Sequence, residues 1–246
     1  MRFSGLSGAR AAERFMKKTS RSAGFAVTKW FGSGRWSKLI DYSNWKFSKI
    51  QDVTWKLNNS TPIYPGDPPL NIEQVKNEVK PYIKISKITM GSHTGTHIDA
   101  PYHMLENGFK LDEIPITNLV GPVKVVQIRG KNVEPEDVPS GYCERVLFKT
   151  TIESYSGAFR ENFSFISKEA AGAIMERNIK LIGIDYLSID EYNFIEPDAH
   201  WTLLGKGITV IEALDLRNVE PGEYFLVALP LNISADASPC RVILLS

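Results

Sequence analysis

Apolar and polar side chains alternate over short stretches of this chain from about residue 50 onward, a pattern that favours β-strands. Residues 83–90 alternate with a period of two, as a half-buried strand does. Residues 180–185 are apolar and short, which is typical of a fully buried strand. Further strands are predicted at 51–57, 121–128, 145–149, 208–214, 224–230 and 241–245.

Helical signals are few. Ser167 is a suitable N-cap for a helix that runs to Arg177, and Asn178 is a suitable stop. Residues 200–204 are expected to form one helical turn, closed by the glycines that follow. A strand-rich chain with few helices favours an α+β architecture over a regular alternation of strands and helices.

Composition changes this picture only at the N-terminus. The 246 residues carry a net charge of +1, but residues 1–40 hold nine basic residues and one acid, a net charge of +8. The other 206 residues hold twenty basic and twenty-seven acidic groups, a net charge of −7, with no nucleic-acid pattern. The absence of an apolar run of eighteen residues predicts no membrane span.

The charge break divides the chain into a basic extension, residues 1–45, and one folded domain, residues 46–246. Frequent serines and scarce acids give the extension the composition of an organellar transit peptide. A basic tail and a wrongly assigned start codon are the alternatives. The two cysteines form no metal or redox motif, so a cytoplasmic location is expected, or a mitochondrial one if the extension is a transit peptide.

Residues 91–103 carry three of the four histidines, His93, His97 and His103, together with Asp99. Imidazole and carboxylate are ligands that Zn, Mn and Fe favour. In an extended segment the side chains of His97 and Asp99 point to the same face and can bind one ion. His93 can join them only if the chain bends, and Gly95 stands where a bend costs least.

Pro101 is expected to end the strand and to turn the chain toward His103. The alternative to a metal site is a polar turn whose histidines cap strands. Ligand types and spacing favour the metal site.

The fourth histidine, His200, precedes Glu212 by twelve residues. On the predicted strand Glu212 shares a face with Ile208, Val210 and Leu214, so a carboxylate interrupts an apolar row. A buried carboxylate needs a partner, and a cation would supply one. The alternative is that this face is solvated. Three polar residues at the end of the buried strand are interpreted as loop caps, with reach to the site as the alternative: Asp185, Ser188 and Asp190.

The histidine pattern resembles the cyclase family of metal-dependent hydrolases, which includes bacterial kynurenine formamidase and isatin hydrolase. The similar residues are His93-x-Gly-Thr-His97-x-Asp99-Ala-Pro-x-His103, followed by His200 and Glu212. The similarity extends from about Ile50 to the C-terminus and includes the segments 62–67, 183–190 and 221–230. This resemblance implies the swivelling β/β/α fold, a small-molecule substrate and a homodimer or homotetramer.

The resemblance also implies a division of roles. His93, His97 and Asp99 would bind a first metal, Asp99 and Glu212 would bridge, and His200 would complete a second. The cofactor would be one or two Zn ions, with Mn as the alternative. His103 would stay off the metal as general acid and base; the alternatives are a further ligand or a satisfied loop histidine.

The reaction implied is cleavage of an amide bond in a small aryl-formamide such as N-formylkynurenine, by metal-activated water. Hydrolysis of a cyclic amide such as isatin is the first alternative, and a non-catalytic family member that binds metal or ligand is the second. Tyr64 stands where Trp is commoner in the formamidases, before Pro-Gly-Asp67. Tyr64 either lines the substrate pocket or packs on its own proline-rich loop.

Overall fold

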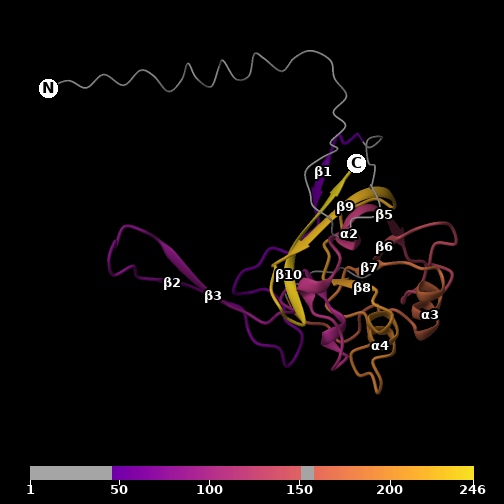
Figure 1. Ribbon diagram of the computed structural model, residues 1–246, viewed down its shortest axis with the longest axis horizontal. Helices are drawn as coiled ribbons and strands as arrows, with labels where there is room; N and C mark the ends of the chain where they lie inside the picture. The colour runs from indigo at the N-terminus through magenta and orange to yellow at the C-terminus, as the bar shows by residue number, and fades with distance from the viewer. Residues whose placement is uncertain (1–45, 151–157) are drawn as a thin grey trace, which may run out of the picture. The chain divides into compact units, whose positions relative to one another are not determined.

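Seven strands of the described chain pair side by side until the last returns to the first, so the sheet closes into a barrel. The computed structural model describes residues 46–150 and 158–246 and is drawn in Figure 1. The order around the barrel is β4-β8-β7-β6-β5-β9-β10. The barrel strands are β4 (His97–Asp99), β5 (Val120–Gln127), β6 (Arg145–Lys149), β7 (Leu181–Ile184), β8 (Thr209–Glu212), β9 (Gly222–Pro230) and β10 (Ala237–Leu245).

Closure depends on β10, which pairs with β4 over its first three residues and with β9 over the rest. β1 (Ile50–Asp52) adds to the end of β10 in antiparallel register. β5, β6, β7 and β8 run parallel to their neighbours in that order, and the other barrel pairs are antiparallel. This mixture, with few helices, confirms the strand-rich α+β architecture.

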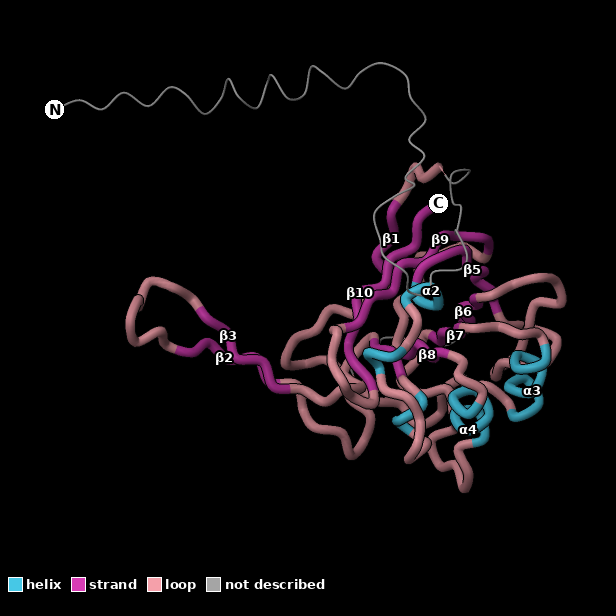
Figure 2. Tube along the Cα trace, viewed as in Figure 1, coloured by secondary structure: helices cyan, strands magenta, loops and turns pink. Residues whose placement is uncertain are grey.

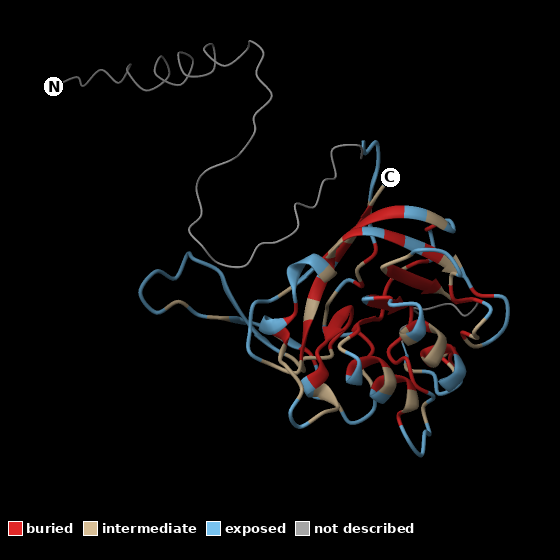
Figure 3. Ribbon diagram, turned by 45° about the vertical axis from the view of Figure 1, so that its right-hand side comes forward, coloured by how far each residue is buried: buried red, intermediate tan, exposed pale blue. Residues whose placement is uncertain are grey.

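Alternation along the strands separates two cores. On β6, Leu147 belongs to the cluster inside the barrel, whereas Val146 and Phe148 belong to a second cluster outside it. Helix α3 (Lys168–Glu176) and helix α4 (Asp198–Gly205) supply the other side of that outer cluster (Figure 2). The buried strands therefore lie between an interior core and a helix-covered face (Figure 3).

Helix α3 forms where its capping residues predict it. The Ser167 side chain accepts a hydrogen bond from the Ala170 backbone N–H at 3.1 Å. Asn178 takes a φ of 55°, the left-handed conformation that ends helices. The remaining helical elements are short: 3-10 helices at Pro101–His103 and Leu111–Glu113, and α2 (Ile116–Leu119).

Two sequence expectations are corrected here. The first strand ends at Asp52 and not at residue 57, with only an isolated bridge at Thr54 beyond it. Leu214 does not share a face with Glu212, because Ala213 takes a φ of 54° and turns Leu214 into the barrel interior. The end of β8 therefore contributes to both cores.

A two-stranded hairpin, which we call the arm, projects from the barrel (Figures 1 and 2). It consists of β2 (Asn71–Val75) and β3 (Ile85–Thr89), and every residue of β3 is exposed. A lone hairpin is marginally stable in water. The arm nevertheless carries exposed apolar side chains, namely Val79, Tyr82, Ile83, Ile85 and Ile88. The alternation at 83–90 predicted β3, but β2 was not anticipated.

The basic extension, residues 1–45, lies outside the described residues, and the boundary at 45/46 remains a prediction. Among the described residues, no helix combines the length and the apolar character that a membrane crossing requires.

Asp185 makes the stability of the domain depend on pH. Its carboxyl is buried just beyond β7, and burial raises its pKa to about 7 although Thr150 donates a backbone hydrogen bond to it. Because this folded-state pKa lies above the unfolded value, the proton stabilises the fold below pH ~4. That contribution is lost as pH rises through about 7.

Asp185→Asn keeps the volume and an acceptor for Thr150 without the ionisation. The parent should lose stability relative to this variant between pH 4 and pH 8, by an amount on the order of a few kcal/mol. Urea unfolding of both proteins at several pH values measures the difference. Parallel curves for the two proteins would mean that Asp185 is already ionised at low pH in the fold.

Candidate metal centre

The histidine motif bends as its glycine predicted. Gly95 takes a φ of 63°, and a Cβ there would lie 2.4 Å from a Leu57 side-chain carbon. The bend returns the chain so that β4 starts at His97, and the Pro101–His103 helical turn follows. His93 is thereby brought within 2.9 Å of Asp99, measured from Nδ1 to Oδ1.

β4 directs its side chains to opposite sides. Ile98 is fully buried in the barrel interior, while His97 and Asp99 point out of the barrel. His97 lies opposite Glu212 in the register between β4 and β8, and its Nε2 is 3.4 Å from Glu212 Oε2. Glu212 is only 3% exposed, so the alternative of a solvated face is wrong.

Helix α4 supplies the last member, His200. Its Nε2 lies 3.3 Å from Glu212 Oε1 and 3.7 Å from Asp99 Oδ2. Three groups of three residues have ligand atoms within 4.8 Å of one another, and two of these groups consist of the predicted metal ligands: His93, His97 and Asp99, and Asp99, His200 and Glu212. These are the five residues that the sequence singled out, and Asp99 belongs to both groups.

The donor atoms of this cluster suit a divalent cation. His97 Nε2, His200 Nε2 and both Asp99 oxygens are buried without a hydrogen-bond partner among the described residues. Unpartnered buried polar atoms are costly, and here they converge from two elements, β4 and α4. Imidazole nitrogen and carboxylate oxygen are the donors of Zn and Mn sites.

The Nδ1 atoms of His97 and His200 contact oxygen acceptors of the chain, and these contacts fix the orientation of the two imidazole rings. His97 Nδ1 lies 2.7 Å from the Gly95 carbonyl oxygen, and His200 Nδ1 lies 2.5 Å from Asp190 Oδ2. In each case Nδ1 donates to an oxygen acceptor, which orients the ring so that Nε2 faces the cluster.

The Asp190 carboxylate also accepts hydrogen bonds from the backbone N–H groups of Ala199 and His200, at the start of α4. The loop-capping interpretation of Asp190 is correct, and its alternative, reach to the site, also holds through His200.

Electrostatics keep the carboxylates ionised. Burial by itself would raise the pKa of Asp99, but His97 and His93 hold it well below its usual range. Burial opposes the charged form of His97, yet Asp99 and Glu212 raise its pKa to about 10. The cluster thus attracts positive charge, which protons supply when no cation does.

His103 differs from the other three histidines. Its ring centroid lies 4.2 Å from that of His93 and 5.6 Å from that of His200. Burial lowers its pKa, so the neutral form is favoured near pH 7. Among the described residues no hydrogen bond holds its ring, and a quarter of its side chain is exposed to a cavity next to the cluster.

That cavity has a volume of about 340 Å³. The segment 64–67 lines it on one side, and His93, His103, His200 and Glu212 line it on another. Tyr64 lines the cavity, and its ring packs edge-on against Phe159 and Tyr192, which lie outside the proline-rich loop.

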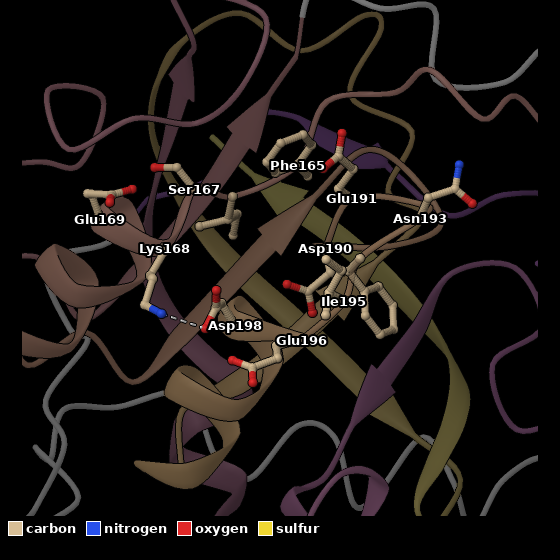
Figure 4. A pocket seen from close by; sticks show the side chains of 12 residues that line it. Phe165, Ser167, Lys168, Glu169, Asp190, Glu191, Asn193, Ile195, Glu196 and Asp198 are labelled. Atoms are coloured by element: carbon tan, nitrogen blue, oxygen red, sulfur yellow. Dashed lines mark ion pairs between the residues drawn. The ribbon is translucent and has the colours of Figure 1, made fainter.

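A second cavity, of about 530 Å³, lies between the start of α3 and residues 190–198 (Figure 4). Its lining includes the Lys168–Asp198 ion pair, 3.0 Å from Nζ to Oδ1. Phe194 lines both cavities, and Asp190, which lines the second one, also contacts His200. None of the four histidines lines this second cavity.

Asp236 was not predicted as a site residue. Its Oδ2 lies 2.8 Å from His93 Nε2, and the hydrogen bond with His93 lowers its pKa to about 2. Asp236 is 133 residues beyond the motif. A polar residue directly before the last strand was the only available signal.

Comparison with known proteins matches the chain to a family. The Cyclase family model matches residues 51–191, which is more than half of the chain. The chain belongs to the cyclase family. The motif-based expectation of this family, and of its fold, is therefore confirmed.

Curated relatives and solved structures in the cyclase family align over nearly their whole length. A kynurenine formamidase of Bacillus cytotoxicus is 34% identical over 205 residues, 81% of this chain and 98% of that protein. The structure of a predicted metal-dependent hydrolase from Bacillus stearothermophilus is 36% identical, with a TM-score of 0.69 over 80% of this chain and 98% of the other. Isatin hydrolase A from Labrenzia aggregata is 26% identical, with a TM-score of 0.68 over 80% and 93%.

Proposed function

We propose that this cyclase-family chain is a metal-dependent hydrolase that cleaves the amide bond of a small aryl-formamide, of the N-formylkynurenine type. The observation that carries the proposal is a convergence of unpartnered, buried nitrogen and oxygen donors next to a cavity of small-molecule size. The similarity of the chain to kynurenine formamidases supports the proposed substrate class.

In this proposal His93, His97 and Asp99 hold one cation, and Asp99, Glu212 and His200 hold a second. Zn is the proposed ion, with Mn as the alternative, because both accept nitrogen and carboxylate donors. When bound, such an ion supplies water of lowered pKa and a positive charge that polarises a carbonyl.

His103 is the proposed proton carrier. It faces the cavity, its neutral form is favoured, and no hydrogen bond among the described residues restrains it. A neutral imidazole can take a proton from the attacking water and deliver it to the departing amine. A scaffold that merely bound metal would have no use for such a histidine, which weighs against a non-catalytic role.

The cavity walls suit an aromatic substrate. Tyr64 and Phe194 contribute rings, and Leu187 adds an apolar surface. Burial raises the pKa of Tyr64 to about 12, so its hydroxyl stays neutral and can donate a hydrogen bond. The Tyr64 ring is the proposed substrate contact.

Ring opening of a cyclic amide such as isatin is the second candidate. It is favoured by the structural match to isatin hydrolase A, at lower identity than the formamidase match. A hydrolysis screen that contains formanilides, isatin and other cyclic amides separates the two.

Metal removal tests the proposal itself. Purified protein should contain Zn or Mn, dialysis against a chelator should abolish hydrolysis, and re-addition of the ion should restore it. Elemental analysis and the substrate screen are performed on the same samples. Full turnover by a demonstrably metal-free preparation would contradict the proposal.

We also propose a homodimer or homotetramer, with the arm as a contact. Residues 71–90 carry four lysines and two glutamates, a net charge of +2. The rest of the domain carries sixteen basic and twenty-four acidic groups, a net charge of −8. Exposed apolar residues on a basic arm suit an acidic second copy, and light scattering of the full chain measures the assembly.

A further inference from the structure

Each of the three histidines proposed as ligands has one ring nitrogen within hydrogen-bonding distance of an acceptor in the chain. His97 has the Gly95 carbonyl, His200 has Asp190, and His93 has Asp236. The Asp236 contact is the one that the sequence analysis did not single out, and Asp236 lies outside the histidine motif and outside residues 51–191, which the family model matches.

The fold fixes the Asp236 backbone against the motif. Its carbonyl accepts the Ala100 N–H at 2.9 Å, and the next residue, Ala237, pairs with Asp99 across β10 and β4. The Asp236 side chain therefore extends from the residue directly before β10, which is the strand that pairs with β4. Its Oδ2 reaches His93 Nε2 at 2.8 Å and also accepts the Ser92 hydroxyl at 3.2 Å.

The two ring nitrogens of His93 consequently face different groups. Nε2 faces Asp236, and Nδ1 faces Asp99 Oδ1 at 2.9 Å, inside the donor cluster. A proton placed on Nε2 is held by Asp236 and leaves the Nδ1 lone pair directed at the cation position. The opposite tautomer would place an N–H where a cation needs a lone pair.

We propose that Asp236 is a positioning residue that fixes the tautomer and the ring orientation of His93, so that Nδ1 binds the metal. This inference rests on the proposed function. A carboxylate behind a metal-binding histidine contributes typically 10- to 100-fold in metal affinity.

The test compares Asp236→Ala, Asp236→Asn and the parent as metal-free full-length proteins. Zn affinity is measured by competition with a chromophoric chelator. Asp236→Ala should bind Zn about 10- to 100-fold more weakly. Asp236→Asn should be weakened less, because its amide oxygen still accepts the His93 proton. Asp215→Ala, which removes a carboxylate paired with Arg217 on the surface, is the matched control and should equal the parent.

Two further readouts separate positioning from general damage. Thermal unfolding of the metal-free proteins should differ little among the variants. The visible spectrum of Co²⁺-loaded Asp236→Ala should differ from that of the Co²⁺-loaded parent, because His93 no longer presents Nδ1 in one orientation.

Parent-like Zn affinity in Asp236→Ala would overturn the inference. So would the loss of one whole ion per chain, because Asp236 would then be a ligand; it lies near His93 and His103 in a third group with suitable spacing. The Zn titration of the parent protein tests the proposed function, because a parent that binds no metal refutes it. The ratio of Zn affinities between variant and parent tests the role of Asp236 alone.

Discussion

Asp99→Ala is expected to release the metal from both proposed positions and to abolish hydrolysis. Asp99 is the one residue shared by the two ligand groups, and both of its oxygens are buried without a hydrogen-bond partner among the described residues. The loss of metal affinity in Asp99→Ala should exceed the 10- to 100-fold loss that is typical when a hydrogen-bond partner of a metal ligand is removed. Elemental analysis and turnover on one formanilide measure the two losses together.

The control for Asp99→Ala is again Asp215→Ala, which removes a carboxylate without touching the cluster. Thermal unfolding without metal shows whether the fold is retained. A variant that keeps one full equivalent of metal would show that Asp99 does not bridge, and the division of ligands would have to be redrawn.

His103→Ala is expected to keep the metal and to lose about 10²–10⁴ in kcat. The side chain lines the cavity, and its ring lies beside two of the proposed ligands without a restraining hydrogen bond among the described residues. The substitution removes the proposed proton carrier but none of the proposed metal ligands. Single-turnover kinetics measure the loss of rate, and elemental analysis of the same preparation measures whether the metal is retained.

The comparison for His103→Ala is His97→Ala, in which metal and activity should disappear together. His103 Nδ1 lies 3.8 Å from Asp236 Oδ2, so a role as a further ligand has a geometric basis to be tested. If the metal content of His103→Ala falls as far as that of His97→Ala, His103 is a ligand and the proton carrier is another group.

The positions that the sequence predicted well are those whose geometry is local. A glycine at 95, a proline at 101 and a period of two between His97 and Asp99 were sufficient to expect a bent segment with two side chains on one face. Glu212 was recognised because a carboxylate in an apolar row demands a partner, and its 3% exposure bears this out.

The features that the sequence did not predict depend on contacts between distant segments. Asp236 matters because β10 pairs with β4, and no local pattern announces that pairing. The left-handed conformation of Ala213 gave no signal either, since alanine has no preference for it. β2 was missed because Asn71–Val75 follows a proline-rich loop and has a polar composition.

β4 is only three residues long, and it borders two environments at once. Substitutions at Ile98 that conserve volume can be absorbed by the barrel core, because neighbouring side chains repack. A shift of β4 by one residue in its register has no such remedy. It would exchange the two faces of the strand, placing an isoleucine among the ligands and an imidazole and a carboxylate in the apolar interior. β4 can therefore tolerate a volume-conserving substitution at Ile98 but not a change in its register.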